Sequence, residues 1–241
     1  TVRQPVQDTI SRSAQRQPAP AEDTSDENKV SGNSAVLIKG IDISHYQGHI
    51  QWVKVKEDGR LFSYFKATEG SSKIDTTFVR HWRHAGQGNM IRGAYHFFDP
   101  EADPILQANH FIRMVKPYLD DQSMPPFIDV ETLPQQTSSK AAYAQNVLTW
   151  IKTVEANLRR RVVIYTNEYI GNKYLSGAEF SQYPLFIAYP ELSVPLNPAR
   201  AKIPKAWKKF AFWQYTQMPD IEGIEGHVDH DVFNGSLQDL L

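Results

Sequence analysis

From Val36 onward, short apolar runs recur along the chain, and each run ends in a polar or aromatic residue. Runs of this length, rich in β-branched and aromatic residues, are typical of buried strands. Eight such runs predict eight strands, at 36–42, 61–69, 91–97, 127–131, 162–166, 185–189, 210–215 and 227–229. The chain from Val36 is therefore expected to form a sheet-rich domain.

Helix-like segments separate the earlier strands. They are predicted at 75–86, 103–118 and 138–160. In the last of them, Val147, Ile151 and Val154 follow the 3.6-residue period of an amphipathic helix, and Asp75 is a candidate N-cap of the first. Strands that alternate with helices favour parallel pairing, and eight of them predict a closed β/α barrel. Because the last three strands leave little room for helices, we expect an irregular TIM-like barrel with a reduced set of helices.

Residues 1–35 have a different composition, rich in Gln, Pro, Ser, Asp and Glu and without an aromatic residue. Such a segment cannot bury enough apolar surface to offset the entropy of the chain. We therefore predict a disordered leader or linker at 1–35 and one folded domain at 36–241. The leader either holds the domain away from a membrane or another domain, or has no role beyond processing.

Composition and charge exclude several classes of function. The 241 residues are 41% hydrophobic and 12% aromatic, which is enough for a substantial core. A net charge of -1 gives no basic field for nucleic acid, and the lack of cysteine excludes disulfides and thiolate chemistry. No apolar run reaches the length that spans a bilayer, so no membrane span is expected. The chain begins with Thr1, which is compatible with removal of an upstream export segment.

The predicted strand at 127–131 ends in two carboxylates that are two residues apart. Because side chains alternate along a strand, Asp129 and Glu131 face the same way, with Cα atoms roughly 6.5 to 7 Å apart. Repulsion between such a pair pushes their pKa values apart, and general acid/base chemistry uses this difference. The alternative is a strand end at which the acids meet solvent or cap a helix.

In β/α barrels the active site lies at the carboxyl ends of the strands. The residues at the predicted ends are Asp42, Glu69, His96, Asp129, Glu131, Tyr165, Tyr189, Gln214 and Asp229. They predict an acidic groove lined with aromatic rings. Such a groove suits a sugar polymer, because rings stack on pyranose faces, carboxylates accept hydrogen bonds from hydroxyls, and two acids can hydrolyse a glycoside.

Seven segments, in order along the chain, resemble glycoside hydrolase family 25, the N-acetylmuramidase or lysozyme family that hydrolyses peptidoglycan. They are Gly40–Gly48 (GIDISHYQG), Phe65–Gly70, Arg92–Phe97, Ile128–Glu131, Ile164–Thr166, Phe212–Tyr215 and Val228–Asp229. The resemblance extends from about Lys39 to the C-terminus. It implies an irregular barrel of eight strands with few helices, in agreement with the pattern above, and a catalytic domain at 36–241.

The resemblance also implies four catalytic carboxylates. Glu131 matches the general acid that protonates the leaving oxygen and then activates water. Asp129 matches the group that stabilises the positive charge at the anomeric centre or orients the 2-acetamido group, and Asp42 and Asp229 complete the site. Mutual repulsion is expected to keep at least one acid protonated, and Glu131 is our choice. Register alone separates Asp229 from Asp231, and the match to the family's segment favours Asp229.

A further set is predicted to bind substrate. It comprises Tyr95, His96, Tyr165, Tyr189, Trp213 and Gln214. Aromatic rings in strands are by default part of the core, but a place at the end of a strand favours the groove. For Trp213 the core and the groove are equally expected. His96 has a second interpretation, a hydrogen bond to a carboxylate behind the site, and Lys66 and Glu69 have one as a structural ion pair.

The histidines near the C-terminus resemble a set of metal ligands, at His227, His230 and the neighbouring acids. A solvated turn after a strand explains them better, so neither a metal nor another cofactor is expected. The expected activity is cleavage of the β-1,4 bond between N-acetylmuramic acid and N-acetylglucosamine in peptidoglycan glycan strands. Two rivals stay open: a glycan-binding module on the same barrel that does not cut, and a metal-dependent deacetylase or amidase. We expect an extracytoplasmic monomer, secreted or periplasmic, with the leader as a possible tether.

Overall fold

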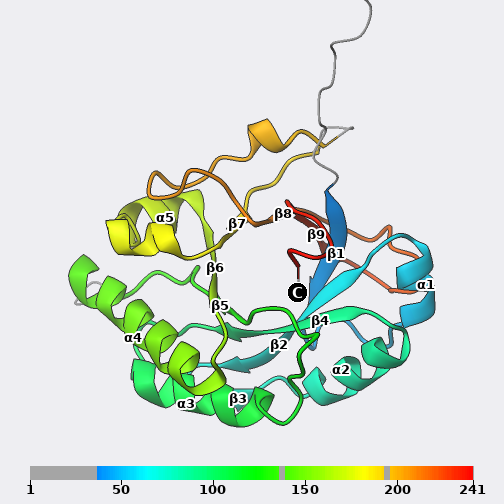
Figure 1. Ribbon diagram of the computed structural model, residues 1–241, viewed down its shortest axis with the longest axis horizontal. Coiled ribbons are helices and arrows are strands. Elements are labelled where there is room, and N and C mark those ends of the chain that lie inside the picture. The colour runs from blue at the N-terminus through cyan, green and yellow to red at the C-terminus, as the bar shows by residue number, and fades with distance from the viewer. Residues whose placement is uncertain (1–36, 136–138, 193–195, 241) are drawn as a thin grey trace, which may run out of the picture. The chain divides into compact units, whose positions relative to one another are not determined.

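The computed structural model describes residues 37–135, 139–192 and 196–240, so the predicted leader at 1–35 lies outside the described residues. The strands are β1 Ile38–Ile43, β2 Phe62–Glu69, β3 Lys73–Ile74, β4 Ile91–Phe97, β5 Phe127–Asp129, β6 Val163–Asn167, β7 Leu185–Ala188, β8 Phe212–Met218 and β9 Val228–Phe233. They form one sheet in the order β1-β9-β8-β7-β6-β5-β4-β2-β3, and a β1–β2 pairing closes it into a barrel (Figure 1). The closed barrel with its irregular strand order confirms the predicted fold class, and the short β3 was not predicted.

Helices surround the barrel on the outside (Figure 1). They are α1 Trp52–Glu57, α2 Phe78–Gln87, α3 Pro104–Val115, α4 Lys140–Leu158 and α5 Glu168–Tyr174, with short 3-10 helices at Ala178–Gln182 and Pro198–Arg200. The three predicted helices correspond to α2, α3 and α4, whereas α1 and α5 were not predicted. Among the described residues, only a 3-10 helix separates β7 from β8 and no helix separates β8 from β9. No described helix is both long enough and apolar enough to cross a membrane.

The prediction that Asp75 caps α2 is wrong. Thr77 occupies the N-cap position, and Asp75 Oδ1 instead accepts hydrogen bonds from the Thr77 backbone N–H at 2.9 Å and from Thr77 Oγ1 at 2.6 Å. The other oxygen of Asp75 accepts a hydrogen bond from the backbone N–H of His45 at 2.8 Å. An Asp that bonds to the backbone two residues ahead forms a turn, and this turn delays the start of the helix.

Alternation along the strands divides the apolar residues into two layers. One layer fills the barrel with rings from Phe62, Tyr64, Tyr95, Phe127, Tyr165, Phe186, Phe212 and Phe233. The other lies between the outer face of the sheet and the helices, where Trp82 of α2, Phe111 of α3 and Trp150 of α4 are buried. A side chain next to an interior ring in sequence therefore points outward, since successive residues of a strand face opposite sides.

The last strand departs from the predicted parallel arrangement. β9 pairs antiparallel with both β1 and β8, whereas the other neighbours around the ring are parallel. A short connection without a helix turns the chain straight back after β8, which an antiparallel pair allows and a parallel crossover does not. The amino end of β9 consequently meets the carboxyl ends of its neighbours, and Asp229, its second residue, lies opposite Asp42.

Two glycines make room for the rings inside the barrel. A Cβ atom on Gly93 would lie 2.2 Å from the Tyr64 ring, and one on Gly40 would lie 2.3 Å from the Phe62 ring. Neither ring has space to withdraw, because both side chains are fully buried and the Tyr64 hydroxyl donates a hydrogen bond to the Pro125 carbonyl at 2.9 Å. The barrel therefore depends on glycine where the sheet and the rings approach most closely.

Replacing Gly93 with alanine should lower the free energy of unfolding by about 1–3 kcal/mol, because the added methyl group overpacks a rigid core. Urea denaturation followed by circular dichroism measures the effect. Gly48→Ala is the control, since a Cβ atom there meets nothing within 4 Å. Equal stability of Gly93→Ala and the parent protein would show that the ring packing is not tight.

Candidate functional site

Acidic side chains gather at the end of the barrel where the parallel strands terminate, which we call the mouth. Asp42 ends the interior row of β1, Asp129 ends β5, and Glu131 follows two residues later. Asp42 and Asp229 are a directly opposed pair on β1 and β9. Burial raises the pKa of Asp129 well above its usual value, and Glu131, Asp42 and Asp229 raise it further. The four carboxylates predicted from the sequence are therefore close enough to repel one another.

Asp42 is oriented by a chain of hydrogen bonds across the barrel. Its Oδ2 atom accepts a hydrogen bond from Gln214 Nε2 at 2.8 Å, and Gln214 Oε1 accepts one from the Tyr165 hydroxyl at 2.9 Å. Burial, and then Asp229, raise the pKa of Asp42, while the bond from Gln214 lowers it. Tyr165 and Gln214, both predicted as groove residues, thus lie at the mouth and hold one of the acids.

Glu131 projects from a short segment that is tied down on both sides. The Val130 backbone N–H donates to the Tyr165 carbonyl at 2.9 Å, and the Val130 carbonyl accepts from Thr166 Oγ1 at 2.8 Å. On the other side, the Tyr143 hydroxyl donates to the Thr132 carbonyl at 2.9 Å. β5 ends at Asp129, two residues before the predicted strand does, but these bonds still hold Glu131 in a defined place.

Glu131 is the exposed member of the acid group. The protein around it raises the pKa of its carboxyl group, and the Lys66 ammonium opposes the rise. The largest upward pKa shifts are instead those of the buried acids Asp42, Asp129 and Asp231, because burial contributes more to these shifts than repulsion does. The raised pKa of Glu131 has the direction expected for an acid that keeps its proton. The pKa values of Asp42, Asp129 and Asp231 are raised as well, so the structure favours protonation at more than one acid.

Lys66 is the positive charge that acts on these acids. It donates a hydrogen bond to Glu69 Oε2 at 2.8 Å, which confirms the predicted ion pair, and it lies 4.5 Å from the centre of the Phe97 ring. Burial alone would raise the pKa of Glu69, but hydrogen bonds from Lys66 and Lys73 overcome it and lower the pKa to about 2. Because the ionised Glu69 neutralises much of the charge of Lys66, Lys66 only partly offsets the repulsion among the acids.

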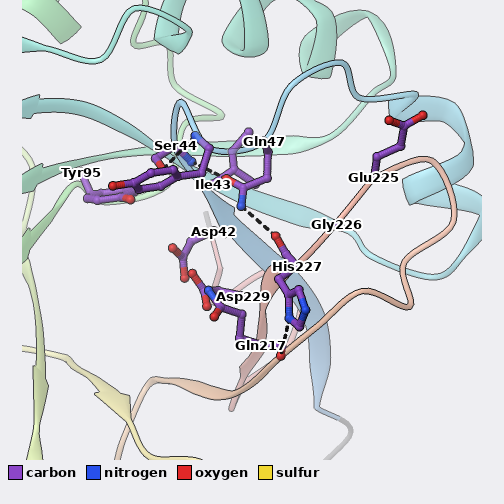
Figure 2. A pocket seen from close by; sticks show the side chains of 11 residues that line it. Asp42, Ile43, Ser44, Gln47, Tyr95, Gln217, Glu225, Gly226, His227 and Asp229 are labelled. Carbon is purple, nitrogen blue, oxygen red and sulfur yellow. Dashed lines mark hydrogen bonds between the residues drawn. The ribbon is translucent and has the colours of Figure 1, made fainter.

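A cavity of about 280 Å³ opens beside Asp42 and Asp229 (Figure 2). Tyr95 forms part of its wall, and this ring stacks on Phe127 at a centroid distance of 4.5 Å. Asp129 and Glu131 do not line this cavity, but Glu131 raises the pKa of both Asp42 and Asp229, and these two acids raise the pKa of Asp129. The mouth therefore consists of a polar cavity with the remaining two acids beside it.

The loop after β1 covers one side of the cavity. Gln47 ties it down, because its Oε1 accepts from the Ser44 backbone N–H at 2.9 Å and its Nε2 donates to the His227 carbonyl at 2.9 Å (Figure 2). The same loop presents Tyr46, whose side chain is 81% exposed and lines the cavity. The sequence interpretation did not single out Tyr46, although an aromatic residue just beyond a strand-end acid was a usable signal.

Three residues predicted to bind substrate lie away from the mouth. His96 is fully buried behind the sheet, where it bonds to Gln107 Oε1 at 3.1 Å and stacks on Trp150, and burial lowers its pKa to about 3. Trp213 is also fully buried in the outer layer and donates to the Tyr189 carbonyl at 2.7 Å. Tyr189 packs against that layer too. Each of the three is next in sequence to a residue that points into the barrel, and therefore faces outward.

The two histidines of the predicted C-terminal turn do not converge on a common point. His227 faces the Gln217 carbonyl at 3.4 Å, whereas His230 lies on the outer face, 3.0 Å from Asp220. In the part of the chain that the structure describes, no group of three or more His, Cys, Asp or Glu residues has the arrangement of a metal site. The chemistry that the mouth offers is proton transfer and stabilisation of positive charge by carboxylates.

Comparisons with known proteins give a consistent result. A model of the family described as glycosyl hydrolases family 25 matches residues 41–224. Uncharacterized protein YegX of Escherichia coli strain K12 is 32% identical over 86% of this chain and 73% of its own length. Lysozyme M1 of Streptomyces globisporus is 32% identical over 90% of this chain and 74% of its own. The bacterial lysozyme structure from Streptomyces coelicolor has a TM-score of 0.75 at 30% identity, covering 84% of this chain and 94% of that one.

Crowding of the acids predicts a pH-dependent gain in stability when Asp229 becomes Asn. The pKa of Asp229 is raised from 3.8 to about 6 by burial, opposed by a hydrogen bond from Gln217 and reinforced by Glu131. Its ionised form is disfavoured in the folded state, so stability falls as the pH rises through this window. At pH 7 the variant should unfold with a free energy about 1–3 kcal/mol larger than the parent.

Urea denaturation over a pH series measures this difference, which should fall towards zero below about pH 3, where both the folded and the unfolded parent hold the proton. Asp121→Asn, in an exposed turn, is the matched control and should show no such trend. A variant less stable than the parent at pH 7 would contradict the interpretation.

Proposed function

The chain belongs to glycosyl hydrolases family 25, and from this premise we propose that it is a peptidoglycan hydrolase of the muramidase type. It cleaves the β-1,4 bond between N-acetylmuramic acid and N-acetylglucosamine. The observation that supports this most is the gathering of Asp42, Asp129, Glu131 and Asp229 at one mouth. Similar proteins carry the names lysozyme and N,O-diacetylmuramidase, the latter from Chalaropsis at 29% identity over 97% of its length.

Glu131 acts as the general acid and then as the general base. Its exposure lets it reach a glycosidic oxygen, and its raised pKa favours the protonated form that a general acid needs. The fixed peptides on either side hold the carboxyl group in one place. After the leaving sugar departs with the proton, the carboxylate accepts a proton from the attacking water.

Asp129 supports the positive charge that develops at the anomeric centre. In the free protein, burial and the neighbouring acids hold its pKa high, and its Oδ1 atom has no hydrogen-bond partner among the described residues. A cation forming beside it favours the ionised form, so the interaction is stronger in the transition state than in the ground state. If the 2-acetamido group of the substrate is the internal nucleophile, the same carboxyl group orients it.

The cavity beside Asp42 and Asp229 binds the sugar. Its volume of about 280 Å³ is at the small end for ligand pockets, which suits one sugar unit. Tyr95 and Tyr46 offer ring faces, while Asp42 and Asp229 accept hydrogen bonds from hydroxyl or amide groups. Tyr165 and Gln214 contribute through the hydrogen bonds that orient Asp42.

The site of action follows from the substrate. Peptidoglycan lies outside the cytoplasm, so we infer that the protein works there, secreted or periplasmic, as a monomer without nucleic acid. The catalytic domain is residues 36–241, and residues 1–35 serve as the linker or tether of this proposal.

Product analysis tests the bond that is cut. Purified peptidoglycan digested with the protein and reduced with borohydride should yield reduced N-acetylmuramic acid, identified by mass spectrometry. The reaction should proceed unchanged in EDTA, because carboxylates rather than a metal carry the chemistry. Reduced N-acetylglucosamine would identify a glucosaminidase, and loss of activity in EDTA would favour a deacetylase or amidase. Intact glycan strands would leave only a binding module.

Replacing Glu131 with Gln should lower kcat by about 10²- to 10⁴-fold with little change in affinity for glycan strands, because the amide keeps the shape but has no proton to donate. Asp129→Asn should also slow turnover severely. Rates of reducing-end release and pull-down on peptidoglycan measure the two properties. Glu57→Gln on the exposed face of α1 is the control. Cleavage by Glu131→Gln at the parental rate would overturn the assignment of the acid.

A further inference from the structure

One buried carboxyl group in the barrel has no part in the steps above. Asp231 is the fourth residue of β9 and lies on the interior face, two residues deeper than Asp229 and opposite both Gly40 of β1 and Gln214 of β8. It is 0% exposed, and neither of its oxygens has a hydrogen-bond donor among the described residues. A buried polar group without a partner requires an explanation, because its desolvation is not compensated.

The surroundings of Asp231 disfavour its ionised form. Burial raises its pKa well above the usual value, and Asp42 and Asp229 raise it further. The titratable groups that respond to its charge from other strands are Tyr64 of β2 and Tyr215 of β8. No described cation lowers its pKa. An ionised Asp231 would be a charge in the barrel with neither a donor nor a counter-ion, so this carboxyl group holds a proton.

The position of that proton follows from the unequal surroundings of Asp231 and Asp42. Two carboxyl groups form a hydrogen bond only when one of them is protonated. Asp42 already accepts a bond from Gln214 and lies at the cavity, whereas Asp231 has no donor. The interaction of the two acids lowers the pKa of Asp42 and raises that of Asp231, which are the directions expected if Asp231 donates and Asp42 accepts. Of this pair, Asp42 is therefore the acid that ionises first and Asp231 the one that keeps its proton.

We propose that Asp231 is a positioning residue, a neutral carboxylic acid beneath the mouth that donates its proton to Asp42 and holds that carboxylate ionised and turned toward the cavity. The inference rests on the proposed function, since it assigns Asp42 to the sugar site. Asp42 then lies between two donors, Gln214 from β8 and Asp231 from β9. These donors fix the carboxylate without a cation, which would compete with the charge that forms on the sugar.

Infrared spectroscopy tests the protonation without any need for turnover. At neutral pH the wild-type protein should show a protonated carboxyl stretch that decreases in Asp231→Asn, whereas Asp121→Asn should leave it unchanged. An undiminished band in Asp231→Asn would overturn the proposal. Because the measurement is made on the free protein, it stands even if the protein fails to cleave peptidoglycan, which would refute the proposed function separately.

Kinetics test the positioning. Asn keeps an N–H donor at this place, so Asp231→Asn should keep kcat within about threefold of the parent. Asp231→Ala removes the donor and should lower kcat about tenfold or more, as loss of a hydrogen bond to a charged group does. Rates are scaled to the folded fraction from circular dichroism. Parental kcat in Asp231→Ala, or an equal loss in both variants, would contradict the proposed donor.

A double-mutant comparison separates positioning from a general effect on packing. If Asp231 acts through Asp42, then Asp231→Ala should cause no further loss of kcat in a protein that already carries Asp42→Ala. Loss of the same size in both backgrounds would show that Asp231 acts independently of Asp42 and would overturn the inference.

Discussion

Like charges held together by a closed barrel are the constraint on which the site depends. The strand pairing closes on itself, so no edge strand can shift to let Asp42 and Asp229 move apart. Alternation sends every second side chain inward, and the rings of the interior layer occupy the depth of the barrel. The mouth is then the place where interior positions are free to carry polar groups. Repulsion that the fold cannot relieve by movement is relieved by protonation.

Hydrogen bonds decide which acids keep their charge. Asp42 accepts from Gln214, and Asp229 has Gln217 beside it, so each has support for an ionised form. Asp129 and Asp231 lie buried with oxygen atoms that no described donor reaches. These hydrogen bonds therefore favour ionisation at the cavity relative to the acids behind and below it, although burial raises the pKa of the cavity acids as well.

The apolar runs were sufficient to predict the eight main strands, because each buried strand is a short apolar segment with little competing signal. They were also sufficient to identify the end of the barrel where the acids gather. They did not determine which face a residue occupies. Tyr95 lines the cavity and His96 is buried behind the sheet, although both belong to the predicted strand end. A shift of one residue reverses the face, and only pairing with neighbouring strands fixes it. Tyr46 was overlooked because it lies in a loop, where periodicity gives no information.

The direction of β9 explains both an error and a success of the sequence interpretation. Asp229 was assigned to the mouth as the carboxyl end of a parallel strand, but it reaches the mouth because the strand runs the other way. An antiparallel strand enters the barrel at the mouth, so its interior positions go progressively deeper. Asp229 lies at the cavity, Asp231 lies below it without solvent, and Phe233 joins the interior rings. Polarity thus falls along a single strand, and a parallel strand ending at the mouth would have left the second acid outside the barrel.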